Sequence, residues 1–250
     1  MKKISIIIPT LNSQKTIKIA LKSIFNQSYK NFEIIIIDAF SKDNTLKIIK
    51  SFKNKKIKIF NVTKKKGLSY ARFYGIKKSS GTLIAFLDSD DYWHKNKLLI
   101  QIRSIQNYNF CSTGFSIIKN NKKMTFLNYP KFLDLKKLIY DRPIANSSVL
   151  VDKKLIYQIA KKYRHVKFAE DYLWWIVIMK KIKKTLFINK NLTYLRISPT
   201  GRTINNFFNN FFSLYIIYKN ILKFSIFKIF FIYLILIKNI FKKKYFYYFK

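Results

Sequence analysis

The sequence predicts an α/β fold in which a mostly parallel sheet is flanked by helices. Three short apolar runs, Ile4–Ile8, Phe32–Ile37 and Leu83–Leu87, are rich in β-branched or aromatic residues and are separated by segments with helical periodicity. Continuous apolar runs are typical of strands buried on both faces, as in a parallel sheet. The alternation of strands and helices indicates parallel strands joined by right-handed crossovers.

The helical segments between these strands are Thr16–Asn26, Asp43–Phe52 and Leu68–Lys78. The second begins with Asp43-Asn44-Thr45, residue types that cap helix N-termini. Ile57–Val62 is a weaker fourth strand. In sheets of this kind the ligand lies beyond the carboxyl ends of the strands, so we expect the site where these runs end.

The middle of the chain, residues 98–200, has a mixed pattern. It predicts helices over Lys97–Asn107 and Glu170–Lys183 and a strand over Cys111–Ile118. We expect one domain over residues 1–205, with a nucleotide half near 1–98 and an acceptor half near 99–205. Residues 206–250 form a helical tail.

The tail is dominated by Phe, Ile, Leu and Tyr, with lysines between them. Its longest uninterrupted apolar stretch is Ile229–Ile237, much shorter than the ~18 residues of a spanning helix. This composition favours an amphipathic helix lying in the head-group region of a membrane. A helix packed on the domain, or used for oligomerisation, is the alternative. The interrupting lysines are Lys219, Lys223, Lys228, Lys238 and Lys242.

Composition limits the classes of protein that fit. The 250 residues are 49% hydrophobic, which is ample for a core and excludes a disordered chain. The formal net charge of +39 indicates either solvated surface lysines or attraction to anionic lipid and phosphate. Cys111 is the single cysteine, and Met1-Lys2-Lys3 precedes no secretion signal, so we expect a cytoplasmic protein on the inner face of the membrane.

Acidic residues are scarce, yet three of the 11 fall within Asp88-Ser89-Asp90-Asp91, directly after the strand Leu83–Leu87. Carboxylates this close repel one another and raise each other's pKa. A divalent cation removes that repulsion, and Mg²⁺ or Mn²⁺ binds carboxylate oxygens while sharing its remaining positions with substrate phosphates. The cluster therefore predicts a metal site.

Four other features could carry chemistry. Asp38 ends the second strand, where a carboxylate can accept hydrogen bonds from a base or ribose. Pro9-Thr10-Leu11-Asn12 ends the first strand without a glycine, which argues against dinucleotide-binding and P-loop folds. Arg72 can pair with a phosphate or form a surface salt bridge. Glu170-Asp171 begins a helix, where acids serve either catalysis or simple capping.

Taken in order, these segments resemble family 2 of the GT-A-fold glycosyltransferases. The resemblance covers residues 4–200 and leaves out the tail. The matching segments are Ile6-Ile7-Ile8-Pro9-Thr10-Leu11-Asn12, Ile37-Asp38-Ala39-Phe40-Ser41-Lys42-Asp43-Asn44-Thr45, Gly67-Leu68-Ser69-Tyr70-Ala71-Arg72, Phe86-Leu87-Asp88-Ser89-Asp90-Asp91-Tyr92-Trp93 with Lys97-Leu98 after it, and Glu170-Asp171 followed by Trp174. Ala39 and Phe40 replace the usual acid or glycine and glycine, and Phe73 replaces an asparagine.

The resemblance implies an inverting, metal-dependent enzyme that uses a nucleoside diphosphate sugar, with UDP as the expected nucleotide. Pro9, Thr10 and Asp38 would line the base and ribose pocket. Arg72 would hold that pocket or the diphosphate. These are expectations from the family pattern.

The same resemblance implies roles for the acidic residues. Asp88 would contact the nucleoside, Asp90 would bind Mn²⁺ or Mg²⁺, and Asp171 would be the general base. Asp91 would support the loop. The weaker candidates are Glu170, Trp174 beside the acceptor, and Arg196 toward the diphosphate.

The acceptor implied is a glycan or a lipid-linked sugar of cell-surface polysaccharide or lipopolysaccharide synthesis, reached at an anionic membrane surface. Three alternatives stay open. A nucleotidyltransferase would be expected to carry a glycine-rich loop after the first strand. A basic nucleic-acid-binding or lipid-binding protein fits the charge, but the lysines form no specific reading element. An inactive sugar-binding relative conflicts with the intact acids.

Overall fold

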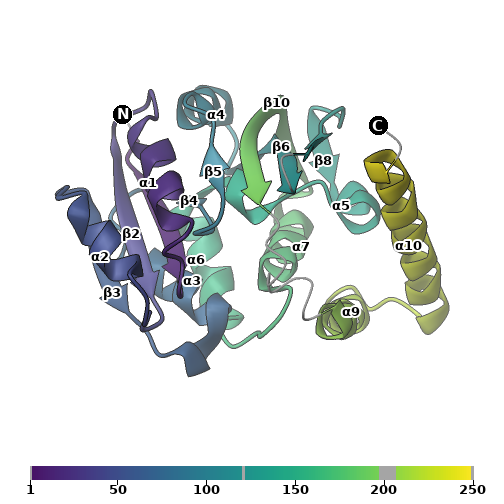
Figure 1. Cartoon of the computed structure of the whole chain (residues 1–250). Helices are drawn as coiled ribbons and strands as arrows, with labels where there is room; N and C mark the ends of the chain where they lie inside the picture. Colours follow the sequence, from purple (N-terminus) through teal and green to yellow (C-terminus); the bar gives the residue numbers. More distant parts are fainter. Residues whose placement is uncertain (1, 120–121, 197–206, 249–250) are drawn as a thin grey trace.

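A computed structural model describes residues 2–119, 122–196 and 207–248 (Figure 1). In this part of the chain ten strands form one sheet in the order β3-β2-β1-β4-β9-β6-β10-β5, with β7 beside β6 and β8 beside β10. Helices cover both faces of the sheet (Figure 1). The predicted α/β class with a flanked sheet is confirmed.

The first half is a parallel sheet with helical crossovers. Strands β1 to β4 pair in parallel in the order β3-β2-β1-β4, so β1 has β2 on one side and β4 on the other. The connection from β1 leads to β2 on one side, whereas the connection from β3 returns to β4 on the other side of β1. Such sheets bind ligands at the carboxyl end of the strands where the order reverses in this way. The elements are β1 (Ile4–Thr10), α1 (Ile17–Phe25), β2 (Phe32–Asp38), α2 (Thr45–Ser51), β3 (Ile57–Asn61), η1 (Lys64–Lys66), α3 (Gly67–Lys78) and β4 (Leu83–Phe86).

These strands are continuous apolar runs because both of their faces are covered. Successive side chains of a strand point to opposite faces. Ile6 and Ile8 of β1 join the core that contains α1, whereas Ile7 joins the core that contains α3. All seven residues of β1 and of β2 are buried, as the predicted two-sided burial requires.

The second half is mixed in direction. β9 is antiparallel to β4 and β6, and β10 runs parallel to β6. The far end of β10 pairs with the short β5, with Tyr194 opposite Tyr92, which brings the end of β10 next to the acidic loop. The elements are β5 (Tyr92–Trp93), α4 (Lys97–Ile105), β6 (Phe110–Lys119), β7 (Lys122–Phe126), β8 (Phe132–Asp134), α5 (Leu135–Asp141), η2 (Asn146–Ser148), β9 (Leu150–Asp152), α6 (Lys153–Lys162), α7 (Glu170–Ile182) and β10 (Lys184–Arg196).

The tail comprises α9 (Phe207–Ile216), the π-helical turn η3 (Ile217–Ile221) and α10 (Ile226–Tyr248). One face of it packs on the domain, where α10 contacts α5 (Figure 1). The hydroxyls of Tyr218 and Tyr172 lie 3.0 Å apart. The tail side chains buried in the same core are Leu214, Ile217, Tyr218, Ile229, Ile232 and Leu236.

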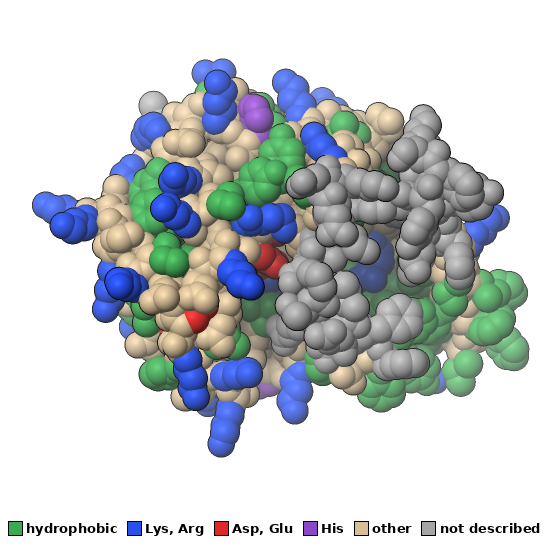
Figure 2. All heavy atoms as spheres, viewed as in Figure 1, with side chains coloured by type: hydrophobic (Ala, Val, Ile, Leu, Met, Phe, Trp, Pro, Cys, Tyr) green, Lys and Arg blue, Asp and Glu red, His purple; other side chains and the backbone are tan. Residues whose placement is uncertain are grey.

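The other face of the tail leaves large apolar side chains exposed. Phe227 is 79% exposed, and Figure 2 shows hydrophobic side chains gathered over α9 and the start of α10. Among the tail side chains whose burial is described, the exposed large apolar ones are Phe212, Ile216, Ile226, Phe227, Phe230, Phe231, Leu234, Ile235 and Ile237. Among the described residues, no helix is both long and apolar enough to cross a bilayer. The predicted boundary at residues 205–206 lies outside the described residues.

Candidate active site

The acidic loop follows β4 at the edge of the sheet where β1 and β2 also end. Thr10 closes β1 opposite Asp38, which closes β2. Asp88 follows β4 directly, and its neighbour Leu87 donates its backbone N–H to the carbonyl of Ile7. The strand ends thus bring together Thr10, Asp38 and Asp88, as the sequence predicts.

Asp38 is fully buried and its carboxylate is held by the protein itself. The hydroxyl of Thr10 donates to Oδ1 at 3.0 Å, and Ser41 donates its hydroxyl to Oδ1 at 2.6 Å and its backbone N–H to Oδ2 at 2.8 Å. Pro9 is buried beside them. Asp38 therefore fixes the turn after β2 against the end of β1 and shapes the pocket there.

Arg72 joins the acidic loop to the start of α7. Its side chain is 3% exposed and donates to Asp88 Oδ1 at 2.6 Å and to Glu170 Oε1. Burial disfavours its positive charge, but Asp88, Glu170 and Asp171 outweigh burial and raise the pKa of the guanidinium. Arg72 is thus a buried cation that braces the carboxylates of Asp88 and Glu170.

The carboxylates of the loop differ in exposure and partners. Burial, reinforced by the charge of Asp88, raises the pKa of Asp90 to about 6. Asp91 is 5% exposed, accepts from Ser147 Oγ at 2.5 Å and from the backbone N–H of Arg196 at 3.1 Å, and has a pKa raised well above its ordinary value by burial and by Asp88 and Asp90. Asp91 is thus buried and hydrogen-bonded within the protein.

Asp88 and Asp90 suit a hard cation. Carboxylate oxygens are the ligands of Mg²⁺ and Mn²⁺, which keep several positions for water and phosphate. Burial first, and then the charge of Asp88, raise the pKa of Asp90, and a bound cation would favour its ionised form. Among the described residues, no group of three or more His, Cys, Asp or Glu side chains could hold a metal. A cation here would depend on the substrate's phosphates for the rest of its coordination.

At the start of α7 two adjacent acids have different surroundings. Glu170 is 4% exposed and bound to Arg72. Asp171 is only partly buried, and its Oδ1 accepts the backbone N–H of Tyr172 at 2.8 Å. The positive end of the helix favours a negative charge at both positions. Asp171 is therefore the accessible carboxylate of the pair.

The expected position of Trp174 beside an acceptor is wrong. Its side chain is fully buried and its ring packs 6.2 Å from that of Phe86, centre to centre. Although Trp174 lies one helical turn after Asp171, its side chain is covered by the core and leaves no exposed surface for a sugar. Its aromatic character reflects packing beneath the strand rather than acceptor binding.

Arg196 lies beside the acidic loop, although it is 105 residues away in sequence from Asp91. Its Nε donates to the backbone carbonyl of Asp90, and its guanidinium lies 5.6 Å from the ring centre of Tyr92. This cation also acts to lower the pKa of Asp90 against the effect of burial. The weakest candidate from the sequence is thus placed next to the site.

Three residues contribute to the site although the sequence assigned them no role there. Ser41 holds Asp38, Asn146 donates from Nδ2 to Asp88 Oδ1 at 3.2 Å, and Ser147 contacts Asp91. The only signal for the last two is a polar Asn-Ser-Ser run immediately before the apolar strand β9, and such runs are common in turns.

Comparison with known proteins places this geometry in a family. The model of glycosyl transferase family 2 matches residues 5–157, more than half of the chain. The chain belongs to this family. It is 34% identical over 179 residues to the Escherichia coli UDP-Glc:alpha-D-GlcNAc-diphosphoundecaprenol beta-1,3-glucosyltransferase WfgD, covering 71% of this chain and 70% of that one. It is 32% identical over 209 residues to WfaP of the same description and organism, covering 83% and 82%.

A solved structure supports the GT-A fold of this family 2 glycosyltransferase. Staphylococcus aureus TarS 1–349 in complex with UDP superposes with a TM-score of 0.68 at 22% identity. The match covers 87% of this chain and 66% of that one. Membership of a glycosyltransferase family argues against the nucleotidyltransferase alternative.

Two departures from the family 2 pattern have structural explanations. Phe40 replaces a glycine and has a φ of 58°, in the left-handed region that glycine adopts without strain, while its ring is 57% exposed. Phe73 replaces an asparagine and is 8% exposed, with its ring 5.9 Å from that of Tyr157. Phe40 therefore strains the backbone of its turn, whereas Phe73 packs into the core.

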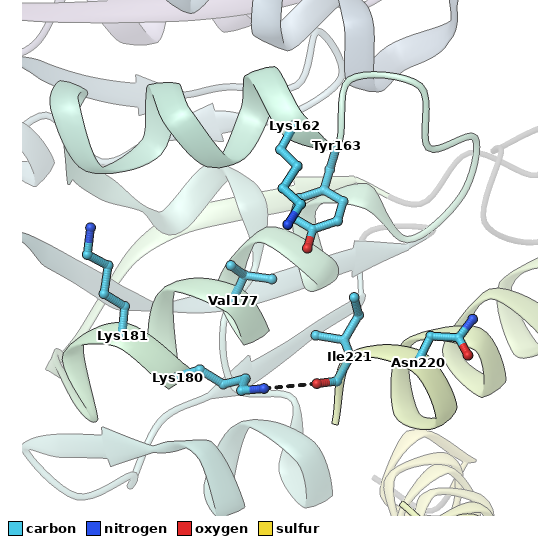
Figure 3. A pocket seen from close by; sticks show the side chains of 7 residues that line it. All are labelled: Lys162, Tyr163, Val177, Lys180, Lys181, Asn220 and Ile221. Carbon is cyan, nitrogen blue, oxygen red and sulfur yellow. Dashed lines mark hydrogen bonds between the residues drawn. The ribbon is translucent and has the colours of Figure 1, made fainter. Parts of the chain in front are cut away.

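A cavity of this glycosyltransferase lies away from the acidic loop. It measures about 440 Å³ and lies between α6, the later turns of α7 and η3 (Figure 3). Lys180 Nζ donates to the carbonyl of Ile221 at 2.9 Å across it. Its lining residues are Lys162, Tyr163, Val177, Lys180, Lys181, Asn220 and Ile221. Because no carboxylate lines it, it lacks both metal ligands and a base.

Proposed function

We propose that this glycosyltransferase moves a sugar from a UDP-sugar to a hydroxyl of a lipid-linked or glycan acceptor, with inversion and with help from a divalent cation. The observation that carries the proposal is the bridge made by Arg72. It joins Asp88, on the donor side, to the α7 terminus that bears Asp171. One buried side chain thus sets the distance between a candidate donor site and a candidate base.

The donor would lie over the ends of β1, β2 and β4. Pro9, Thr10 and Asp38 would line the base and ribose, and Asp88 would face the nucleoside. The names of WfgD and WfaP specify UDP-glucose, and the TarS structure holds UDP, which supports a UDP-sugar here. Glucose is accordingly the first sugar to test.

The cation, Mn²⁺ or Mg²⁺, would be held by Asp90 with Asp88 nearby. When bound, it neutralises the negative charge that develops on the departing diphosphate. Arg196, fixed against the carbonyl of Asp90, adds a positive charge on the same side. These residues together would favour cleavage of the bond between sugar and phosphate.

Asp171 would accept the proton of the acceptor hydroxyl. The acceptor oxygen then attacks the anomeric carbon from the face opposite the diphosphate, so the configuration inverts. A partly exposed carboxylate at a helix N-terminus suits this role because it reaches substrate while the helix dipole favours its anion. Glu170 cannot serve because Arg72 occupies it.

The acceptor would be a sugar on a diphospholipid, as the names of WfgD and WfaP specify for those enzymes. The exposed apolar face of α9 and α10, flanked by the exposed lysines Lys219, Lys223, Lys228 and Lys238, would bind the inner face of an anionic membrane. Enzyme and acceptor would then meet at one surface.

A donor panel tests the proposal. Purified protein is mixed with UDP-, GDP-, ADP- and dTDP-sugars, with Mn²⁺ or with a chelator, and with a lipid-linked GlcNAc acceptor. We expect UDP release and an inverted product only with a UDP-sugar and metal. Transfer that is unaffected by the chelator would rule out the metal role, and retention of configuration would rule out Asp171 as a simple base.

Vesicle binding tests the membrane surface separately. We expect the chain to co-sediment with vesicles rich in phosphatidylglycerol and much less with phosphatidylcholine alone. Phe227→Ser with Phe231→Ser should weaken binding at unchanged Tm, because both rings are exposed. Equal binding of this variant and the parent would contradict a bilayer contact at this face.

A further inference from the structure

The short turn η2 lies against the acidic loop and is buried. Ser147 is 1% exposed and Asn146 is 6% exposed. Four hydrogen bonds join the turn to residues 88–93 of the loop. They are Asp88 N to Ser147 Oγ at 3.1 Å, Ser147 Oγ to Asp91 Oδ2 at 2.5 Å, Asn146 Nδ2 to Asp88 Oδ1 at 3.2 Å, and Trp93 Nε1 to Ser147 O at 2.8 Å.

The hydroxyl of Ser147 takes part in two of these four hydrogen bonds. A hydroxyl donates one proton and also accepts, so it can satisfy a carboxylate and a backbone N–H at once. Ser147 does both: it donates to Asp91 and accepts from the backbone of Asp88. One atom therefore holds both ends of the four-residue turn, residues 88–91, that carries Asp90.

The neighbouring Asn146 orients the carboxylate of Asp88. Its Nδ2 and a guanidinium nitrogen of Arg72 donate to the same oxygen, Oδ1. Two donors from opposite parts of the chain thus set the rotation of that carboxylate. The backbone of Asp88 is held by Ser147 and its side chain by Asn146.

We propose that Ser147 is a positioning residue of the donor site, which holds Asp88 and Asp91 so that the Asp90 carboxylate faces the bound nucleoside diphosphate and its cation. This inference rests on the proposed function, since it deepens the account of the same site. Hydrogen-bond partners of metal-binding carboxylates typically change metal affinity about ten- to hundredfold when removed. We expect an effect of that size.

The chain offers a matched control in the same turn. Ser148 is also fully buried, but its hydroxyl donates to the carbonyl of Ala145 at 2.7 Å instead of to the acidic loop. Ser148→Ala removes a buried hydroxyl of equal size. Ser147→Cys keeps the side-chain volume but replaces the hydroxyl by a weak donor and acceptor, which separates hydrogen bonding from cavity formation.

Two measurements test the inference. Hydrogen–deuterium exchange of the nucleotide-free protein reports on the amides of residues 88–91, and calorimetry reports the Kd of UDP with Mn²⁺. We expect faster exchange and about ten- to hundredfold weaker UDP binding in Ser147→Ala and Ser147→Cys. Ser148→Ala should match the parent within about twofold.

The outcomes separate the two proposals. If the parent binds no nucleoside diphosphate, the proposed function fails. If the parent binds UDP but Ser147→Ala and Ser148→Ala are equally affected, or if Ser147→Cys restores binding and slow exchange, the positioning role is wrong. Faster exchange with unchanged UDP affinity would also overturn it, because the loop would then be held without consequence for the donor.

Discussion

The acidic loop after β4 and the start of α7 each present two adjacent acids, and each divides them in the same way. In the loop, Asp91 is 5% exposed and bonded within the protein while Asp90 is more accessible. At α7, Glu170 is 4% exposed and paired with Arg72 while Asp171 is more accessible. In both places one carboxylate anchors the local structure and leaves its neighbour available for chemistry.

Two acids that are neighbours in the sequence thus differ in role: one is buried and structural, and the other is accessible to a substrate. Burial without partners would be costly for a carboxylate, so each anchor has donors, and those donors come from distant segments. Asp91 uses Ser147, and Glu170 uses Arg72. Through Arg72, which also contacts Asp88, Glu170 connects the start of α7 to the acidic loop. The proposed donor site lies at this loop.

The strongest test of the division at α7 is Asp171→Asn. Loss of the proposed base should reduce kcat by about 10²–10⁴-fold while the Kd of UDP stays unchanged. Steady-state kinetics with saturating donor, together with calorimetry, would measure both. Normal turnover by this variant would show that Asp171 is not the base, so that the accessible acid of the α7 pair has no chemical role.

The matched change at the anchor is Glu170→Gln. Removing one partner of a buried ion pair leaves Arg72 incompletely compensated, and we expect a loss of about 3–5 kcal/mol in the free energy of unfolding. Chemical denaturation of the two amide variants side by side would check this. A Glu170→Gln protein as stable as Asp171→Asn would show that Glu170 is not an anchor.

In the acidic loop the equivalent change is Asp90→Asn. We expect metal-dependent UDP binding to weaken by more than about a hundredfold, since loss of a ligand should exceed the effect of losing a partner of a ligand. Calorimetry with and without Mn²⁺ gives the measurement. UDP binding that is already insensitive to Mn²⁺ in the parent would place the metal role elsewhere.

How far the sequence predicts this molecule depends on the source of each signal. The strands β1, β2 and β4 were predictable because burial on both faces makes continuous apolar runs. The short strands β5, β8 and β9 were not, because two or three residues carry no periodicity. Their pairing depends on contacts between distant segments.

The site shows the same limit. Asp88, Asp90 and Asp171 stand in short sequence motifs, so the sequence alone proposes them as candidates. The burial of Trp174 and the contacts of Ser147 depend on how α7 and η2 pack, which no local pattern encodes. The sequence points to Arg72 as a candidate, but its ion pair with Glu170 could not be predicted, because the two residues are 98 positions apart.

A pH titration of stability tests the raised pKa of Asp90 in the acidic loop. Burial and the charge of Asp88 raise the folded-state pKa of Asp90 to about 6, above its unfolded value. For an acid with a raised pKa, folding is favoured when it is protonated, so this contribution is lost as pH rises from about 4 to 6. In metal-free protein the contribution of Asp90 to stability should therefore increase on moving from pH 7.5 to 5.

The Asp90→Asn variant should lack that part of the pH dependence, together with the part of the raised pKa of Asp91 that is due to Asp90, and the difference in Tm between the two proteins would report their sum. Glu33 does not interfere, because despite its burial, hydrogen bonds from Ser5, Ser80 and Lys58 lower its pKa to about 2. Its contribution to stability is lost only at lower pH, as the pH falls toward that value. Identical pH profiles for parent and variant would contradict a crowded charge at Asp90.

The smallest expected effect concerns the turn after β2, where Asp38 is an anchor and Phe40 is strained. A side chain in the left-handed region costs about 1–2 kcal/mol that glycine avoids, while glycine loses about 0.4–1 kcal/mol through the entropy of the unfolded chain. Phe40→Gly should thus stabilise the protein by about 1 kcal/mol or less in denaturant unfolding. Phe40→Ala keeps Cβ and the strain, so it should give no such gain. A glycine variant less stable than the alanine variant would show that the turn is not strained, and that the ring of Phe40 stabilises the pocket which Asp38 shapes.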